Sequence, residues 1–170
     1  MTVAPGITKP DWKRELKALL PLFGHRNWIV VADSAYPAQS RPGIDTIVSG
    51  VGQIEAARRV LDAIAASKHV RARIYLDQEL EFVAEADAPG VSRYHTQLAE
   101  LLKSAKATTL PHEQIIARID QAAQLFRVLI IKTELTIPYT SIFFELDCGY
   151  WCAEAEQRLR RAMAASAKKQ

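Results

Sequence analysis

The sequence of 170 residues contains few of the motifs that mark common functional classes. Its seven glycines are scattered and form neither a Gly-x-Gly-x-x-Gly fingerprint nor a Walker loop, which argues against a nucleotide phosphate site. The four histidines show no His-x-His or His-Glu-x-x-His spacing, so no metal site is predicted. A Gly-x-Ser-x-Gly nucleophile elbow is also missing. The sequence therefore predicts chemistry that needs no metal and no cofactor.

The sequence also has few cysteines, no long apolar run and only a small net charge. Cys148 and Cys152 are the two cysteines, and their spacing matches neither a redox Cys-x-x-Cys pair nor a four-ligand zinc site. We interpret them as reduced thiols in a cytoplasmic protein, with a regulatory disulfide as the alternative. No apolar run approaches the roughly 18 to 20 residues that span a bilayer, and residues 1–6 show no signal-peptide pattern. The net charge of +3 is mild, so no nucleic-acid partner is expected.

The distribution of apolar residues predicts a single α/β domain. Strands are expected at 28–31, 44–48, 71–76, 108–110, 127–131 and 141–146, and helices at 9–23, 53–67, 92–104, 111–125 and 152–165. This alternation favours three layers, with a largely parallel sheet covered by helices on both faces. The last two strands are too close for a helical crossover, so they should pair antiparallel or lie at a sheet edge. Residues 1–151 would form the domain, and residues 152–170 a charged helical extension.

Polar side chains at the ends of the predicted strands are the best candidates for a functional site. His25 precedes the buried strand 28–31 and Asp33 follows it. Strand ends are where α/β proteins place functional side chains, because the strand fixes the backbone while the loop exposes the side chain. His112 begins a predicted helix, where the helix dipole favours a neutral imidazole. Further polar candidates are Glu134 and Tyr139, between the last two predicted strands, and Ser141, at the start of the last one.

Each of these candidates also has a purely structural interpretation. His25 would suit the C-terminal turn of the first helix, and Asp33 could cap backbone amides of its own loop. His112 could be a surface histidine in a first turn, and Tyr139 an amphipathic loop residue. From the residues alone, both interpretations stay open.

Four short segments, in order, resemble the family of the D-ribose pyranases and L-fucose mutarotases. The first is Leu-Phe-Gly-His at 22–25, followed by the strand, Ala-Asp at 32–33 and a proline at 37. The second is Pro-His-Glu-Gln at 111–114, and the third is Thr-Glu at 133–134. The fourth is Pro-Tyr-Thr-Ser-Ile at 138–142, where the family has an asparagine in place of Ser141. The resemblance covers roughly residues 12–150.

The resemblance implies an enzyme that interconverts anomers or ring forms of a free monosaccharide without a cofactor. His25 matches the catalytic histidine of the family. The substrate-binding candidates are Asp33, His112, Tyr139, Ser141 and Glu134, and Asp33 could also orient His25. Arg41, Trp28 and Tyr36 are looser candidates for substrate or interface contacts. The resemblance also implies a ring of subunits, typically a decamer, whose sites are completed by a neighbouring chain.

Two other functions remain open at this point. A relative that kept the sugar pocket but lost turnover would be a sugar-binding or regulatory protein. A ring-forming protein whose terminal helix recruits a partner is the third possibility. The Glu154, Glu156, Arg158, Arg160 and Arg161 pattern suits this role, and it suits a solvated helix face equally well.

Overall fold

The computed structural model describes residues 11–167, and the predicted first helix turn at residues 9–10 lies outside this range. A six-stranded sheet forms the centre, in the order β2-β5-β1-β6-β3-β4. Its strands are β1 (Trp28–Ala32), β2 (Ile44–Val48), β3 (Val70–Asp77), β4 (Ala107–Leu110), β5 (Val128–Lys132) and β6 (Ile142–Cys148). Five strands run in one direction and β6 runs against them, because β6 pairs antiparallel with both β1 and β3. The predicted largely parallel α/β sheet is confirmed.

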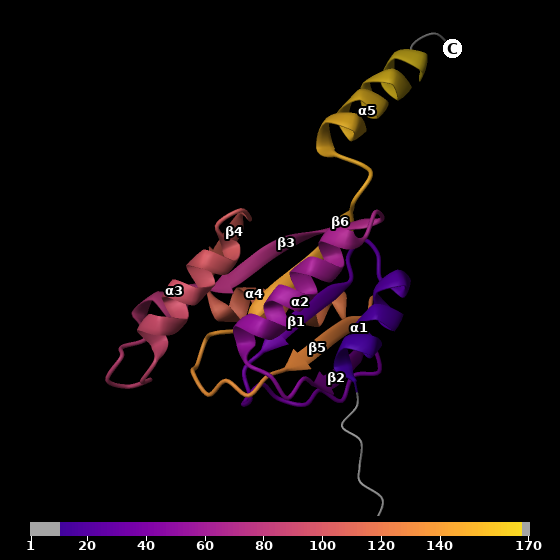
Figure 1. Cartoon of the computed structure of the whole chain (residues 1–170). Helices are drawn as coiled ribbons and strands as arrows, with labels where there is room; N and C mark the ends of the chain where they lie inside the picture. Colours follow the sequence, from indigo (N-terminus) through magenta and orange to yellow (C-terminus); the bar gives the residue numbers. More distant parts are fainter. Residues whose placement is uncertain (1–10, 168–170) are drawn as a thin grey trace, which may run out of the picture.

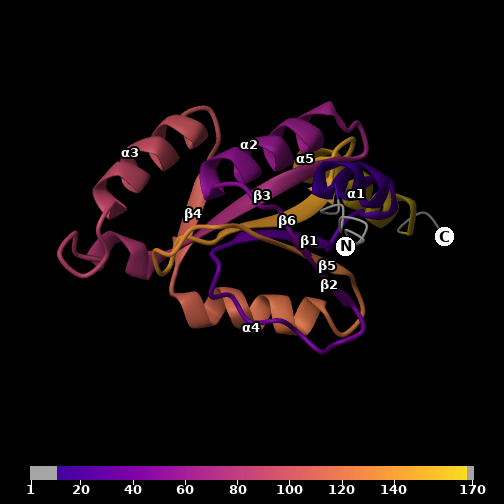
Figure 2. The ribbon, with the colours of Figure 1, turned by 60° about the horizontal axis from the view of Figure 1, so that its bottom comes forward.

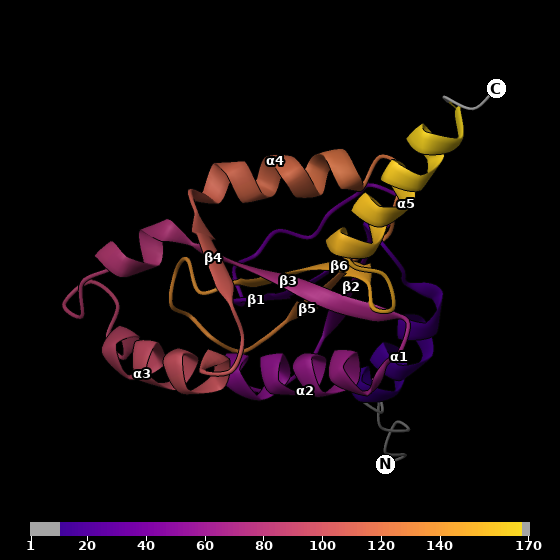
Figure 3. The same ribbon diagram turned by 90° about the horizontal axis from the view of Figure 1, so that it is seen from above.

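Helices cover both faces of the sheet, which gives the predicted three layers (Figures 2 and 3). One face carries α1, α2 and α3, and the other carries α4. Their bounds are α1 (Trp12–Leu19), α2 (Gln53–Ala66), α3 (Val91–Leu102), α4 (His112–Ala122) and α5 (Ala153–Ala167), with short 3-10 turns η1 (Leu20–Leu22) and η2 (Gln78–Phe82). No helix within residues 11–167 is both long and apolar enough to cross a bilayer.

Alternate residues of the central strands pack in two separate apolar cores, one on each face of the sheet. Ile29 and Val31 of β1 pack with α1, α2 and α3, whereas Trp28 and Val30 pack beneath α4. Because side chains alternate across a strand, a strand that is buried on both faces must be apolar throughout. All five residues of β1 are accordingly buried.

The predicted pairing of the last two strands is wrong. β5 and β6 do not pair with each other, because β1 lies between them. β6 is also not an edge strand, since it lies between β1 and β3. The connection at residues 133–141 is long enough to cross the end of β1, and the apolar β6 then gains burial on both faces at the centre of the sheet.

The same connection is held in place by the buried side chain of Gln53. Its Nε2 donates to the carbonyl oxygens of Val31 and Thr140, both at 2.8 Å, and its Oε1 accepts from the Thr133 hydroxyl. The Tyr94 hydroxyl donates to the same Thr140 carbonyl at 2.7 Å. These bonds fix the backbone immediately before β6, where the candidate residues Tyr139 and Ser141 lie.

We expect Gln53→Met to lower the free energy of unfolding by about 1–3 kcal/mol. Methionine keeps the length of the side chain but removes the three buried hydrogen bonds that Gln53 makes with Val31, Thr140 and Thr133. Urea unfolding followed by circular dichroism measures the change. Gln97→Met, at an exposed position on α3, is the matched control and should shift stability by less than about 0.5 kcal/mol. Equal effects of the two substitutions would contradict the assigned role of Gln53.

Candidate functional site

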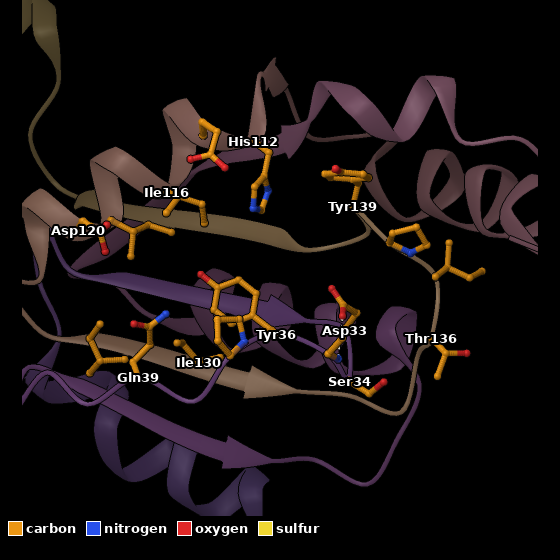
Figure 4. A pocket seen from close by; sticks show the side chains of 17 residues that line it. Asp33, Ser34, Tyr36, Gln39, His112, Ile116, Asp120, Ile130, Thr136 and Tyr139 are labelled. Carbon is orange, nitrogen blue, oxygen red and sulfur yellow. Dashed lines mark hydrogen bonds between the residues drawn. The ribbon is translucent and has the colours of Figure 1, made fainter. Parts of the chain in front are cut away.

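A cavity of about 480 Å³ lies at the carboxyl edge of the parallel strands. Its walls come from the loop after β1, from α4, and from residues 136–139 of the β5–β6 connection (Figure 4). Asp33, His112 and Tyr139, which are far apart in the sequence, all line it. This edge is where ligands bind in open α/β sheets, and the volume suits a small molecule. The structure therefore brings together three of the six predicted site residues.

His112 is oriented by a carboxylate that the sequence analysis did not select. His112 Nδ1 lies 3.0 Å from Oδ1 of Asp77, the last residue of β3, and the side chain of Asp77 is fully buried. Glu79 accepts the backbone N–H of His112 with both carboxylate oxygens at 3.0 Å. With Nδ1 engaged by Asp77, Nε2 of His112 is left for the cavity, toward which the ring points (Figure 4).

Burial gives Asp77 unusual acid–base properties. Removal from water raises the pKa of Asp77 to about 6, although the hydrogen bond from His112 acts in the opposite direction. Its second oxygen, Oδ2, has no hydrogen-bond partner among the described residues. A carboxyl group with a pKa near neutrality, paired with an imidazole, is the kind of pair that exchanges protons at physiological pH.

Tyr139 lies beside His112 at the cavity, and its backbone is in a strained conformation (Figure 4). The two rings meet edge to face, with 5.6 Å between their centroids. Tyr139 has a φ of 57°, in the left-handed region that a non-glycine residue seldom adopts. Such strain costs of the order of 1–3 kcal/mol and concentrates at functional sites. The structure thus holds an aromatic ring over the cavity at an energetic cost.

Asp33 and Tyr36 form the opposite wall (Figure 4). One carboxylate oxygen of Asp33 accepts the backbone N–H of Ala35 at 2.9 Å, so the capping interpretation is correct for that oxygen. Burial, followed by the negative charges of Asp120, Asp77 and Asp33, raises the pKa of Tyr36 to about 12. Its hydroxyl therefore stays protonated and can donate a hydrogen bond.

His25 belongs to a second, separate cluster at the other end of the sheet. Its Nδ1 lies 2.9 Å from Oδ1 of Asp147, near the end of β6. Arg71 and Arg73 donate to Oδ2 of Asp147 at 3.0 and 2.9 Å. Burial acts to raise the pKa of Asp147, but hydrogen bonds from Arg71, from the Cys148 amide and from Arg73 outweigh it and hold that pKa well below its usual range. The ionised Asp147 accepts from Nδ1 of His25, and Nε2 of His25 accepts the Nε–H of Arg26 at 3.4 Å.

Within one chain, His25 and Asp33 do not meet. They flank β1, whose five residues span about 17 Å at the usual strand rise. They also line different cavities, and the second cavity, of about 490 Å³, contains His25 and Asp147. The predicted orientation of His25 by Asp33 is therefore not made inside a single subunit, where Asp147 takes that role.

Of the remaining predicted residues, only Tyr36 is among those that line the first cavity. Ser141 is buried beneath the connection and does not line the cavity, and the exposed Glu134 does not line it either. Among the looser candidates, Tyr36 lines the cavity, Arg41 donates to the Asp120 carbonyl at 2.9 Å, and Trp28 stacks on Tyr75 in the core beneath α4.

Sequence reasoning missed both carboxylates that orient the histidines. Asp77 directly follows the predicted strand 71–76, so the rule that selected Asp33 would also have selected it. Asp147 directly follows the predicted strand 141–146 and carries the same signal, but its contact with His25 depends on the antiparallel pairing of β6 with β1 and β3, which the sequence did not predict. Among the described residues, no group of three or more His, Cys, Asp or Glu side chains is placed to hold a metal ion.

Comparisons with known proteins are consistent with this geometry. Residues 9–149 match the model of the RbsD / FucU transport protein family. No curated protein matches the sequence. The fold is similar to Bacillus subtilis RbsD complexed with D-ribose, with a TM-score of 0.54, 16% identity, and coverage of 86% of this chain and 98% of that chain.

A second solved structure with the same fold is the fucose mutarotase from Streptococcus pneumoniae in complex with L-fucose, with a TM-score of 0.52 and 19% identity. It covers 84% of this chain and 98% of its own. FucU from Bifidobacterium longum, also with a TM-score of 0.52 and 19% identity, covers 79% and 94% respectively. At these identities the structures show a shared fold, and the family match extends over most of the sequence. The chain therefore belongs to the RbsD / FucU family.

Proposed function

We propose that this protein is a cofactor-independent mutarotase or pyranase that interconverts the anomers or ring forms of a free aldose. The observation that carries the proposal is the His112–Asp77 pair, which faces a cavity of about 480 Å³ in a member of this family. Tyr139 offers an aromatic edge and Asp33 a carboxylate, which suit the apolar face and the hydroxyls of a sugar.

The chemistry of ring opening needs two proton transfers. A base removes the proton from the anomeric hydroxyl, the bond between C1 and the ring oxygen breaks, and an acid protonates that oxygen to give the open-chain aldehyde. Closure on the other face of the carbonyl, or by another hydroxyl, gives the second anomer or ring form. Imidazoles serve both steps near neutral pH, since they can hold or release a proton there.

We assign the two steps to two histidines from different subunits. His112 of one subunit would act with His25 of its neighbour, because the two lie at opposite ends of the sheet within a chain. Asp77 and Asp147 would orient the two imidazoles. A head-to-tail contact repeated between copies closes into a ring, and the decamer implied by the family resemblance is one such ring.

Asp33 and Tyr139 would bind the sugar hydroxyls and position the ring. Glu134 and Ser141 do not line the cavity, so they would not contact the sugar directly within one subunit. Ser141 would act through the backbone of the β5–β6 connection, since it is buried beside that loop.

Cys148 and Cys152 are both free and partly exposed, which suits the reducing cytoplasm where we place the protein.

Exchange NMR with a panel of free aldoses tests the function. We expect at least one of ribose, fucose, rhamnose, galactose and glucose to show anomeric or ring-form exchange well above the buffer control. Asp33→Asn should weaken binding of that sugar, whereas Asp62→Asn, at an exposed position on α2, should leave it unchanged. Exchange at the buffer rate with every sugar would reject the enzymatic assignment.

A non-catalytic sugar-binding or regulatory protein is the second candidate. The replacement of the family asparagine by Ser141, which does not line the cavity, favours it. Saturation-difference NMR distinguishes the two functions. Binding without accelerated exchange would support the regulatory protein, and binding with exchange would support the enzyme.

A further inference from the structure

The terminal helix α5 buries none of its residues against the rest of residues 11–167. It projects from the body after β6 (Figure 1). An isolated helix of 15 residues is only marginally stable in water, and most helices gain stability by packing an apolar face. The family match ends at residue 149, so nothing shared with the family accounts for this helix.

One side of α5 is apolar and is bordered by arginines. The apolar positions recur at helical spacing: Ala155, Leu159, Ala162 and Met163. Leu159 and Met163 are 43% and 55% exposed. Glu156 accepts from both Trp151 and Arg160, whereas Arg158 and Arg161 make no ion pair within residues 11–167. The helix thus presents an apolar stripe with positive charge beside it.

A surface of complementary character follows β3. The acidic segment, residues 79–87, contains Phe82, which is 76% exposed, and three exposed acidic side chains: Glu81, Glu85 and Asp87. None of these three forms an ion pair with a basic side chain in the described part of the chain. Glu85 is held by the backbone N–H groups of Gly90 and Ser92 at 2.6 and 2.9 Å, which fixes the segment's shape.

The two surfaces lie at opposite ends of the sheet and face away from each other in one chain. α5 follows the end of β6, while the acidic segment follows the end of β3, and those ends are separated by the length of β3, about 23 Å (Figure 3). Because α5 extends away from the sheet, it does not contact the acidic segment of its own subunit (Figure 1). It can reach that of a second copy placed head to tail.

Both surfaces also border the two half-sites. Trp151, immediately before the extension, and Glu156 within it line the same cavity as His25, and Glu79 of the acidic segment accepts the backbone N–H of His112. We propose that α5 of one subunit docks on the acidic segment of its neighbour in the same head-to-tail contact. Leu159 and Met163 pack against the neighbour's exposed Phe82, and Arg158 and Arg161 face its carboxylates. This inference rests on the arrangement in the proposed function, but it uses residues outside the sugar site.

Charge reversal and its compensation test the docking. One variant carries Arg158→Glu and Arg161→Glu, a second carries Glu81→Arg and Asp87→Arg, and a third carries all four substitutions. Light scattering after size exclusion, over a dilution series, measures self-association. We expect each double variant to associate at least about tenfold more weakly, because like charges then oppose each other, and the fourfold variant to recover.

Arg14→Glu with Arg58→Glu, at exposed positions on α1 and α2, is the matched control and should assemble as the wild type does. Circular dichroism establishes that each variant is folded. Wild-type assembly of both double variants would overturn the docking, and so would a fourfold variant that fails to recover. A monomeric wild type would overturn it too. Sugar exchange is measured separately on the wild type, so a ring without exchange rejects the proposed function and leaves the docking intact.

Discussion

His25→Ala is expected to abolish accelerated sugar exchange while leaving the fold intact. A general acid or base contributes typically about 10²- to 10⁴-fold to a rate, and His25 is half exposed, so its loss removes little packing. Exchange NMR and thermal unfolding measure the two effects. His95→Ala, which replaces another partly exposed histidine away from both clusters, is the matched control and should retain exchange.

Complementation between subunits decides whether the site is shared. We expect His25→Ala and His112→Ala each to be inactive, and co-expressed mixtures of the two to regain activity. In a mixed head-to-tail ring, a site with both histidines forms wherever a His112→Ala subunit supplies His25 to a His25→Ala neighbour. Random mixing restores about a quarter of the sites. Mixtures that stay inactive although both chains are present in one oligomer would refute the shared site.

Asp77→Asn is expected to lower the rate of exchange about 10- to 100-fold, a part of what a complete general acid or base contributes. Asparagine keeps an oxygen near Nδ1 of His112 but removes the negative charge that stabilises the protonated imidazole. Glu113→Gln, at the next position on α4, is the control at the rim of the same cavity and should retain most of the activity. Equal rates for Asp77→Asn and the wild type would contradict the paired role.

The same substitution should change how stability depends on pH. The pKa of Asp77 is raised to about 6 in the folded protein, so between its ordinary value and that pKa the folded state binds more protons than the unfolded state. The contribution of Asp77 to stability is therefore present at low pH and is lost as the pH rises through about 6. Wild type should lose on the order of 1–3 kcal/mol across this window.

Urea unfolding at several pH values between 4 and 8 measures the contribution of Asp77. Asp77→Asn should lack this loss of stability, since asparagine does not titrate. His112→Gln should displace the midpoint, because the hydrogen bond and the charge of His112 lower the pKa of Asp77. A pH dependence of stability that is identical in wild type and Asp77→Asn would contradict burial of an ionisable carboxyl group at this position.

The sequence determined the local elements and part of the cavity wall. The apolar run from Trp28 to Val31 and the stripes on α2, α3 and α4 specify their structure within a few residues, because periodicity is a local property. Asp33 and His112 were predictable as site residues, since each follows a strand whose carboxyl end lies at the same edge of the sheet. The short motifs were sufficient to identify the family before any tertiary contact was known.

Only the tertiary structure decided which of these groups act together. The reversed insertion of β6 between β1 and β3 brings Asp147 to His25, and the position of β3 beside β4 brings Asp77 beneath His112. Both contacts join residues far apart in the sequence, and strand order and direction are set by burial of whole faces rather than by local pattern. The length of β1 then separates His25 from Asp33, so two candidate residues that are close in sequence line two different cavities.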